Sequence, residues 1–227
     1  AQNGATSADT LVNFALIHAD LKPDYLLVLD GINDLESSFQ TGFRPDYSHR
    51  RRKIPDVPFP ILDALPGWLD YSALWVQVRW ALTGDQRDLH ELYTKVGAFD
   101  YQRGPFGIET FRRNLLSLDA LARLHGARLI LGTPPFYREH ADDLQWARES
   151  PGVSFGAPWQ RGIDAENDII RALARADKNV VLAEAARSFA PSRETMTDFC
   201  HLTEAGNRKI AEAFLAALRR SLRKAGP

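Results

Sequence analysis

The sequence predicts an α/β protein in which helices cover the faces of a parallel β-sheet. Residues 25–29 form an unbroken apolar run, which is typical of a strand buried on both faces. Two further strands are predicted at residues 128–133 and 180–182, and amphipathic helical patterns separate the three strands. This alternation of strand and helix favours an α/β sandwich built around a parallel sheet.

Apolar residues at helical spacing predict four helices. A hydroxyl at Thr6 followed by an acid at Asp9 opens the first helix, whose pattern ends near Asp20. The second helix stops at Gly126, the third precedes the last strand, and the fourth follows Thr203. Their apolar faces are formed, in chain order, by Leu11, Phe14 and Ala15; by Ile108, Phe111, Leu115, Leu118 and Ala122; by Ile163, Ile170, Leu173 and Ala174; and by Ile210, Phe214 and Leu218.

Length and composition narrow the class of protein. The 227 residues suffice for one domain that contains a large insertion. With a net charge of −1, neither nucleic acid nor an anionic membrane is favoured as a partner. The single cysteine excludes an internal disulfide and a cysteine-based metal cluster. No apolar run approaches the roughly 20 residues of a transmembrane helix.

Residues 36–105 differ in character from the rest of the chain. They are rich in proline and aromatic residues, and they interrupt the alternation of strands and helices. We therefore predict a partly helical insertion here. An insertion at the end of a strand lies where a lid or specificity loop is commonly found.

The first candidate site motif is Gly31-Ile32-Asn33-Asp34, directly after the strand at 25–29. Ligands of open α/β sheets bind at the carboxyl ends of the strands. The side-chain amide of Asn33 is therefore well placed to donate to a developing oxyanion. The alternative is an ordinary turn, because glycine, asparagine and aspartate are common turn formers.

The second candidate motif is Asp198-Phe199-Cys200-His201, which precedes the last helix. Here a carboxylate can orient the imidazole, and the imidazole can then act as general base for a hydroxyl nucleophile. The alternative is a helix cap at Asp198 beside a surface histidine.

Taken together, the two motifs and the strand–helix pattern between them resemble the SGNH (GDSL-like) serine hydrolases over residues 3–218. The resemblance implies a three-layer α/β sandwich around a parallel, flavodoxin-like sheet, and it implies hydrolysis of an acyl ester. This chemistry requires no metal and no organic cofactor. The residues that the resemblance assigns are Asp198 and His201 of the catalytic triad, Asn33 and Gly4 as oxyanion-hole donors, and Gly31 and Asp34 as supporting residues.

The third member of the triad, a serine, has no convincing candidate in the sequence. In the family, a Gly-Asp-Ser block precedes the glycine block that Asn3–Ser7 resembles. We therefore expect the serine upstream of residue 1, a domain truncated at its N-terminus, and no activity from residues 1–227 alone. The segment Gly152-Val153-Ser154-Phe155-Gly156 matches a G-x-S-x-G nucleophile elbow, but it lacks the required strand before it and helix after it, and is interpreted as a loop.

The resemblance leaves the substrate and the exact reaction open. The ester could be that of a small molecule, a lipid or a carbohydrate, and the acyl group acetyl or longer. One alternative is an O-acyltransferase that moves the acyl group to a carbohydrate. The other is a non-catalytic SGNH-like scaffold that binds glycans or partners. By analogy with similar bacterial proteins, we expect export or membrane anchoring through an upstream segment.

Overall fold

The computed structural model describes residues 5–40, 42–47, 107–141 and 156–224. The chain divides into two units, Ala1–Phe39 with Asp100–Pro227, and Gln40–Phe99. All the elements named below belong to the first unit. Most of the insertion predicted at 36–105 lies outside the described residues, so its partly helical nature and its role as a lid remain predictions.

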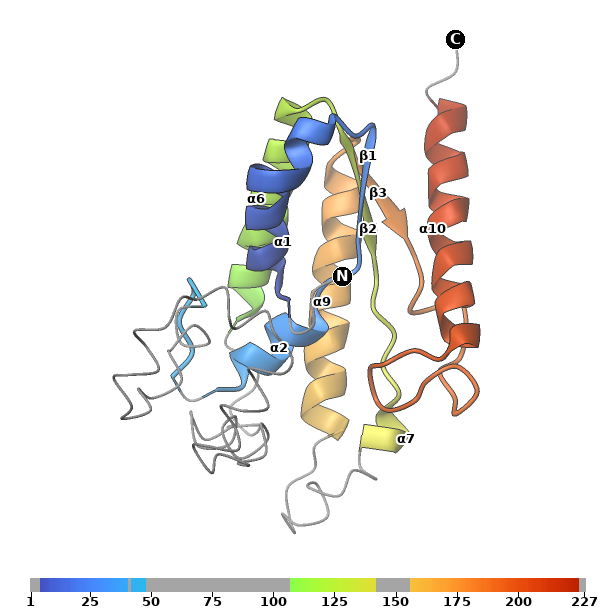
Figure 1. Cartoon of the computed structure of the whole chain (residues 1–227). Coiled ribbons are helices and arrows are strands. Elements are labelled where there is room, and N and C mark those ends of the chain that lie inside the picture. The colour runs from blue at the N-terminus through green and yellow to red at the C-terminus, as the bar shows by residue number, and fades with distance from the viewer. Residues whose placement is uncertain (1–4, 41, 48–106, 142–155, 225–227) are drawn as a thin grey trace, which may run out of the picture. The chain divides into compact units, whose positions relative to one another are not determined.

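The sheet has three parallel strands, β1 (Tyr25–Val28), β2 (Arg128–Gly132) and β3 (Val180–Ala183), in that order. Tyr25 lies opposite Arg128 at one junction, and Leu129 lies opposite Val180 at the other. The predicted strands and their parallel arrangement are thus confirmed (Figure 1).

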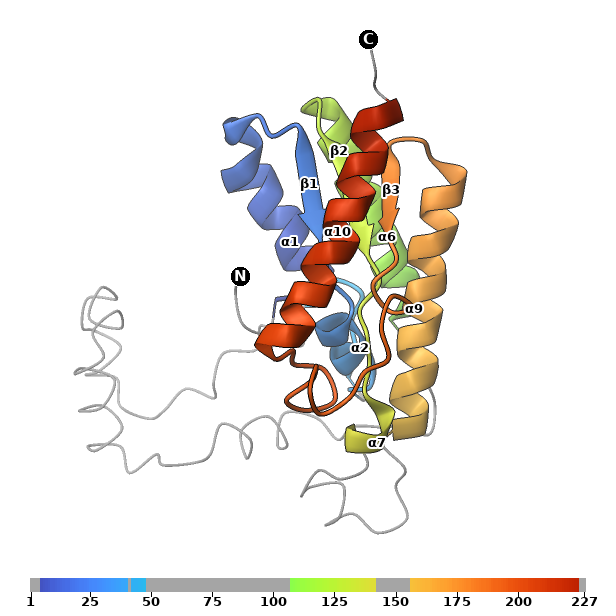
Figure 2. The same cartoon turned by 90° about the vertical axis from the view of Figure 1, so that its right-hand side faces the viewer.

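Helices cover both faces of this sheet and make three layers. One face carries α1 (Ser7–Asn13), α6 (Ile108–Leu124) and α9 (Gly156–Ala176), and the other carries α10 (Glu204–Lys224) (Figure 1). Figure 2 shows α10 crossing in front of the strands. Two short helices, α2 (Ile32–Ser38) and α7 (Arg138–Ala141), follow the carboxyl ends of β1 and β2. The α/β class predicted from the sequence is confirmed.

The central strand β2 contains three consecutive apolar residues because both of its faces are covered. Successive side chains of a strand point to opposite faces. Leu129 and Leu131 pack into the core beneath α6 and α9, whereas Ile130 packs into the core beneath α10. The positions after its first residue, the partly buried Arg128, are therefore all buried and carry no polar side chain.

The first strand, β1, differs from the prediction of burial on both faces. Val28 is 5% exposed, but Leu27 is 49% exposed and Leu29 is 36% exposed. Leu27 and Leu29 are exposed because the helix on their side of the sheet, α10, packs mainly on β2 and β3. Within the described residues β1 pairs only with β2, so it is an edge strand there.

The first helix forms where predicted, but its type changes along its length from α-helical to π-helical and then to 3₁₀. The carboxylate of Asp9 accepts hydrogen bonds from both the backbone N–H and the hydroxyl of Thr6, so the predicted capping box is present. After α1 the chain continues as a π-helical segment, Phe14–His18, and a 3₁₀ turn, Ala19–Leu21. The turn ends at Lys22, which has a left-handed backbone conformation.

The helix α9 begins earlier than the pattern predicted. Gly156, interpreted from the sequence as the end of a loop, is its first residue, and Ala157, Pro158 and Trp159 are helical too. Proline is well tolerated in a first helical turn because no intrahelical partner awaits its missing N–H. The rest of the G-x-S-x-G segment lies outside the described residues.

Among the helices that the structure describes, none is long and apolar enough to cross a membrane.

Candidate active site

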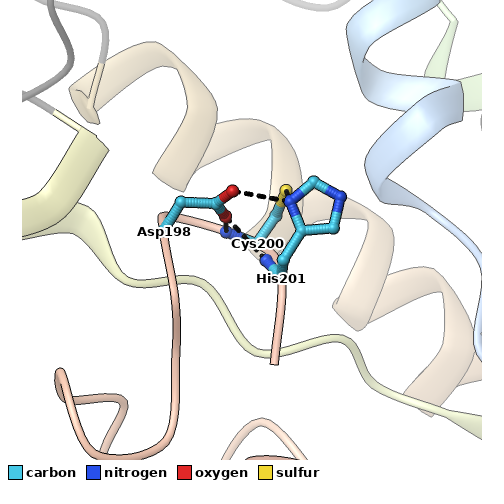
Figure 3. A group of neighbouring side chains, drawn as sticks. All are labelled: Asp198, Cys200 and His201. Atoms are coloured by element: carbon cyan, nitrogen blue, oxygen red, sulfur yellow. Dashed lines mark hydrogen bonds and ion pairs between the residues drawn. The ribbon is translucent and has the colours of Figure 1, made fainter. Parts of the chain in front are cut away.

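The loop between β3 and α10 brings Asp198 and His201 into direct contact. The Asp198 Oδ2 atom lies 2.6 Å from the His201 Nδ1 atom. The other oxygen, Oδ1, accepts the backbone N–H groups of Cys200 at 2.8 Å and of His201 at 2.7 Å. Figure 3 shows the imidazole turned toward the carboxylate, with the thiol of Cys200 beside it. The two predicted residues therefore form an acid–imidazole pair.

The environment of this pair favours an ionised carboxylate. Partial burial works to raise the pKa of Asp198, but hydrogen bonds from the backbone of His201 and Cys200 and from the imidazole lower it below its ordinary value. An ionised carboxylate only accepts hydrogen bonds, so it holds the neutral imidazole with its proton on Nδ1. The His201 side chain is 75% exposed, and no described residue hydrogen-bonds its other nitrogen, Nε2. That nitrogen is the one a general base would use.

Aromatic packing anchors the loop that carries the pair. The ring of Phe199 lies 5.2 Å from that of Trp159 and 5.9 Å from that of Phe136, measured between centroids. The backbone N–H of Tyr137 donates to the carbonyl of Phe199 at 2.9 Å. The loop is therefore fixed to α9 and to the segment after β2. Neither contact could be predicted from local sequence.

The start of α10 decides against the helix-cap alternative for Asp198. The helix is capped by Thr203, whose hydroxyl accepts the N–H of Gly206 at 3.2 Å. A Cβ atom at Gly206 would lie 2.0 Å from the carbonyl oxygen of Thr195, so only glycine fits there. Asp198 instead closes its own short turn.

The Gly31 motif begins a helix rather than a simple turn. Gly31 has a φ of 139° and stands at the N-cap of α2. This backbone conformation requires glycine, and a Cβ atom there would also lie 2.7 Å from Glu166 Oε2, so the glutamate side chain would have to move. Asn33 lies in the first turn of α2, and its side-chain N–H donates to the carbonyl of Ala5 at 2.8 Å. Because an amide nitrogen carries two hydrogens, this bond uses one of its two donors.

The N-terminal segment is tied to the same motif. The carboxylate of Asp34 is 1% exposed and accepts the backbone N–H of Ser7 at 2.8 Å and its hydroxyl at 2.5 Å. The side chain of Asn114 donates to that hydroxyl at 2.9 Å. Asp34 thus joins the start of α1 to α2 through buried hydrogen bonds, and its assignment as a supporting residue of the active site stays a prediction. Gly4, the second assigned oxyanion donor, lies outside the described residues, although its neighbour Ala5 lies against Asn33.

A pocket of about 130 Å³ is lined by residues of both motifs, but Asp198 and His201 are not among its lining residues. It lies at the carboxyl ends of β1 and β2, where ligands of open α/β sheets were expected to bind. The residues that line it are Ala5, Leu29, Asp30, Gly31, Ile32, Asn33, Pro134, Pro135, Cys200 and Leu202. A larger hollow of about 750 Å³, near Arg128, Lys178 and Arg220, contains none of the predicted site residues.

Two acids beside this pocket, the partly buried Asp30 and the buried Glu166, were not found from the sequence. Burial raises the pKa of Asp30 to about 7; a hydrogen bond from Thr10 works against the rise, and the charges of Asp34 and Asp9 add to it. Burial also raises the pKa of Glu166, and the charges of Asp34 and Asp30 raise it further. Within the described residues, Asp30 Oδ2 and Glu166 Oε2 have no hydrogen-bond partner. The position of Asp30 at the end of a strand was the only sequence signal.

The remaining candidate nucleophile near the pair is the thiol of Cys200. Burial raises its pKa, and the negative charge of Asp198 raises it further. Because the thiolate rather than the thiol is nucleophilic, Cys200 is poorly suited to attack an ester.

Comparison with known proteins identifies the fold. No family model matches the sequence, and no curated protein matches it. Among solved structures, a GDSL-like lipase from Parabacteroides merdae superposes with a TM-score of 0.53 at 15% identity, over 94% of this chain and 68% of the other. A GDSL-like lipase from Bacteroides thetaiotaomicron gives 0.49 at 17% identity, over 98% and 73% of the two chains. A catalytic mutant of an acetylxylan esterase from Geobacillus stearothermophilus gives 0.49 at 18%, over 94% and 68%.

The class of the protein follows from the first of these matches. The chain has the SGNH, or GDSL-like, α/β fold, and the resemblance seen in the sequence is confirmed at the level of the fold.

Proposed function

We propose that residues 1–227 form part of an SGNH-type serine esterase. In this proposal, Asp198 and His201 activate a serine, and Asn33 and Gly4 stabilise the oxyanion. The observation that supports it most is the 2.6 Å contact between Asp198 Oδ2 and His201 Nδ1, on a loop that lines the same pocket as Asn33.

The proposed reaction follows from the protonation states of the pair. The serine hydroxyl attacks the ester carbonyl while His201 Nε2 takes its proton, and Asp198 stabilises the imidazolium that forms. The N–H groups of Asn33 and Gly4 donate to the negative oxygen of the tetrahedral intermediate. His201 then protonates the leaving alcohol. Water releases the acyl group by the same steps, again with His201 as base.

The size of the pocket supports a short acyl group, such as acetyl. A volume of about 130 Å³ is well below the roughly 300–1,000 Å³ of sites that enclose drug-sized ligands. The alcohol part of the ester would then lie outside the pocket. It can belong to a small molecule, a lipid or a carbohydrate.

Within the described residues, one edge of β1 pairs with no other strand. This edge supports a proposal for where the serine lies. Parallel sheets are normally buried, and edge strands with exposed apolar side chains are rare. A further parallel strand would pair with β1, and a helix connecting such a strand would cover Leu27 and Leu29, which are exposed in the described part of the chain. Its carboxyl end would lie at the same edge of the sheet as the pocket. We place the serine at the end of such a strand, in a segment that precedes residue 1.

The test is turnover of a chromogenic acetyl ester by the full-length protein and by its variants. We expect His201→Ala to lower kcat by about 10⁴-fold or more, as loss of a triad member does in serine hydrolases. The matched control is His18→Ala, which removes an exposed histidine outside the pocket and should retain activity. Turnover that survives His201→Ala would reject the proposed function.

A further inference from the structure

Three side chains of different chemistry converge at the acid–imidazole pair. One ligand atom from each of Asp198, Cys200 and His201 lies within 4.8 Å of the other two (Figure 3). The Cys200 Sγ atom is 3.5 Å from His201 Nδ1, and Asp198 Oδ2 is 2.6 Å from the same nitrogen. All three residues belong to one four-residue turn that Asp198 Oδ1 closes through two backbone N–H groups. Their proximity therefore does not depend on the packing of distant segments.

The sulfur–nitrogen distance suits a tetrahedral metal ion, whereas the oxygen–nitrogen distance must lengthen. For zinc bonds to sulfur of about 2.3 Å and to nitrogen of about 2.0 Å, tetrahedral angles place the two ligand atoms about 3.5 Å apart. The sulfur–nitrogen pair in this structure is already at that separation. A carboxylate oxygen and a nitrogen on the same ion are about 3.3 Å apart, so Asp198 Oδ2 would have to withdraw by about 0.7 Å.

We propose that Asp198, Cys200 and His201 bind a zinc-like transition-metal ion and that its binding switches off the acid–imidazole pair. Thiolate and imidazole ligands favour zinc over magnesium or calcium, which prefer oxygen. Three protein ligands and a water complete four-coordination. The Cys200 thiol releases its proton to solvent as the sulfur–metal bond forms. The exposed imidazole of His201 leaves the ion a path of approach from solvent.

The inhibitory effect follows from the chemistry of imidazole. In the active pair, Nδ1 carries the proton and Nε2 offers its lone pair to the serine. A neutral imidazole that binds a metal through Nδ1 carries its proton on Nε2 instead. That nitrogen then has no lone pair with which to accept the serine proton. This consequence rests on the proposed function, whereas the binding of the ion does not.

The binding test uses cobalt(II) with the full-length protein and with its Cys200→Ser variant. A sulfur-to-cobalt charge-transfer band in the near ultraviolet that is present in the parent and absent from Cys200→Ser reports Cys200. We expect this band to saturate at one equivalent of cobalt, together with the intense visible bands of a tetrahedral site, and to disappear when one equivalent of zinc is added. Absence of the charge-transfer band would overturn the proposal.

Variants separate this three-ligand site from casual binding by the thiol. We expect Cys200→Ser and His201→Ala each to weaken zinc binding by more than about tenfold, since even second-shell partners contribute that much. The matched control, His18→Ala, removes an exposed histidine outside the cluster and should bind zinc as the parent does. Circular dichroism verifies that each variant is folded. Zinc affinity that is unchanged in folded His201→Ala would equally overturn the proposal.

The regulatory consequence is tested in the full-length protein as a ratio. For each variant, turnover with zinc is divided by turnover without it, so differences in basal activity cancel. We expect a low ratio for the parent and a ratio near one for Cys200→Ser. Cobalt binding in a protein that shows no esterase activity would refute the proposed function and leave the metal site standing. Esterase activity without a cobalt band would refute the metal site and leave the proposed function standing.

Discussion

The carboxylate of Asp34 accepts both the backbone N–H and the hydroxyl of Ser7, and so fastens the beginning of α1 to the first turn of α2. The two residues are far apart in the sequence, yet their contact holds Ala5 beside Asn33. The geometry of the pocket therefore depends on a buried polar contact as well as on the sheet.

Removing that contact should destabilise the protein markedly. We expect Asp34→Ala to lower the free energy of unfolding by about 2–4 kcal/mol, because it leaves the buried donors of Ser7 without their acceptor. Urea unfolding measures the change. The exposed Asp20→Ala is the matched control, with an expected change within about 0.5 kcal/mol. Equal stability of the two variants would show that the hydrogen bonds between Asp34 and Ser7 do not stabilise the fold.

A methyl group at residue 206 should disturb the loop that carries Asp198. A Cβ atom there would press on the carbonyl of Thr195, and we expect Gly206→Ala to cost about 1–3 kcal/mol or more. In an ordinary helix the same change stabilises by up to about 1 kcal/mol, so the sign of the effect is diagnostic. Thermal unfolding measures it. Lys209→Ala, one turn later on an exposed position, is the control and should be nearly neutral.

The raised pKa of Asp30 should make the protein less stable as the pH rises. Its pKa is about 7 in the folded protein, above its ordinary value, so between about pH 4 and pH 7 the folded state binds more protons than the unfolded state. Asp30→Asn removes this dependence. We expect the variant to gain about 1 kcal/mol or more relative to the parent between pH 4 and pH 8. Urea unfolding at several pH values measures it, and a gain that shrinks toward pH 8 would contradict it.

A charged clamp between α9 and the end of β3 should behave cooperatively. The guanidinium of Arg171 donates to both oxygens of Glu184, at 2.8 Å each, and the hydroxyl of Thr133 donates to the same carboxylate. These bonds, led by that of Arg171, lower the pKa of Glu184. The clamp therefore stabilises the fold above the ordinary pKa of a glutamate and weakens on acidification.

The effects of replacing Arg171 and Glu184 should not add. The double replacement should destabilise the protein by less than the sum of the two single replacements. We expect Arg171→Met to lower the free energy of unfolding by about 1–3 kcal/mol, because the partly buried carboxylate of Glu184 loses both hydrogen bonds from the guanidinium. Adding Glu184→Met should then restore part of the loss. A double-mutant cycle measures the coupling, and strict additivity of the two changes would contradict the clamp.

How much of this the sequence could predict depends on the range of each contact. Asp198 and His201 are three residues apart, so their pairing follows from local chain geometry and could be predicted. The strands and their parallel arrangement followed from apolar runs and strand–helix alternation. The partial exposure of β1 did not, because it depends on which strands α10 covers.

Other contacts join parts of the chain that carry no shared pattern. Glu166 reads as one polar position in an amphipathic helix, and nothing local indicates that its carboxyl lies against Gly31. The bond between Asn33 and Ala5 likewise appears only in the folded chain. The early start of α9 at Gly156 was hidden because glycine and proline usually indicate a loop.

The close approach of Glu166 to Gly31 also constrains how the sequence can evolve. Residue 31 has no room for a Cβ atom, because the carboxyl of Glu166 and the ring of Pro134 occupy that space. The backbone conformation at 31 also requires glycine, so only the other two positions can exchange volume. Related sequences should therefore keep glycine at 31, and a larger side chain at 134 or 166 should be accompanied by a smaller one at the other position.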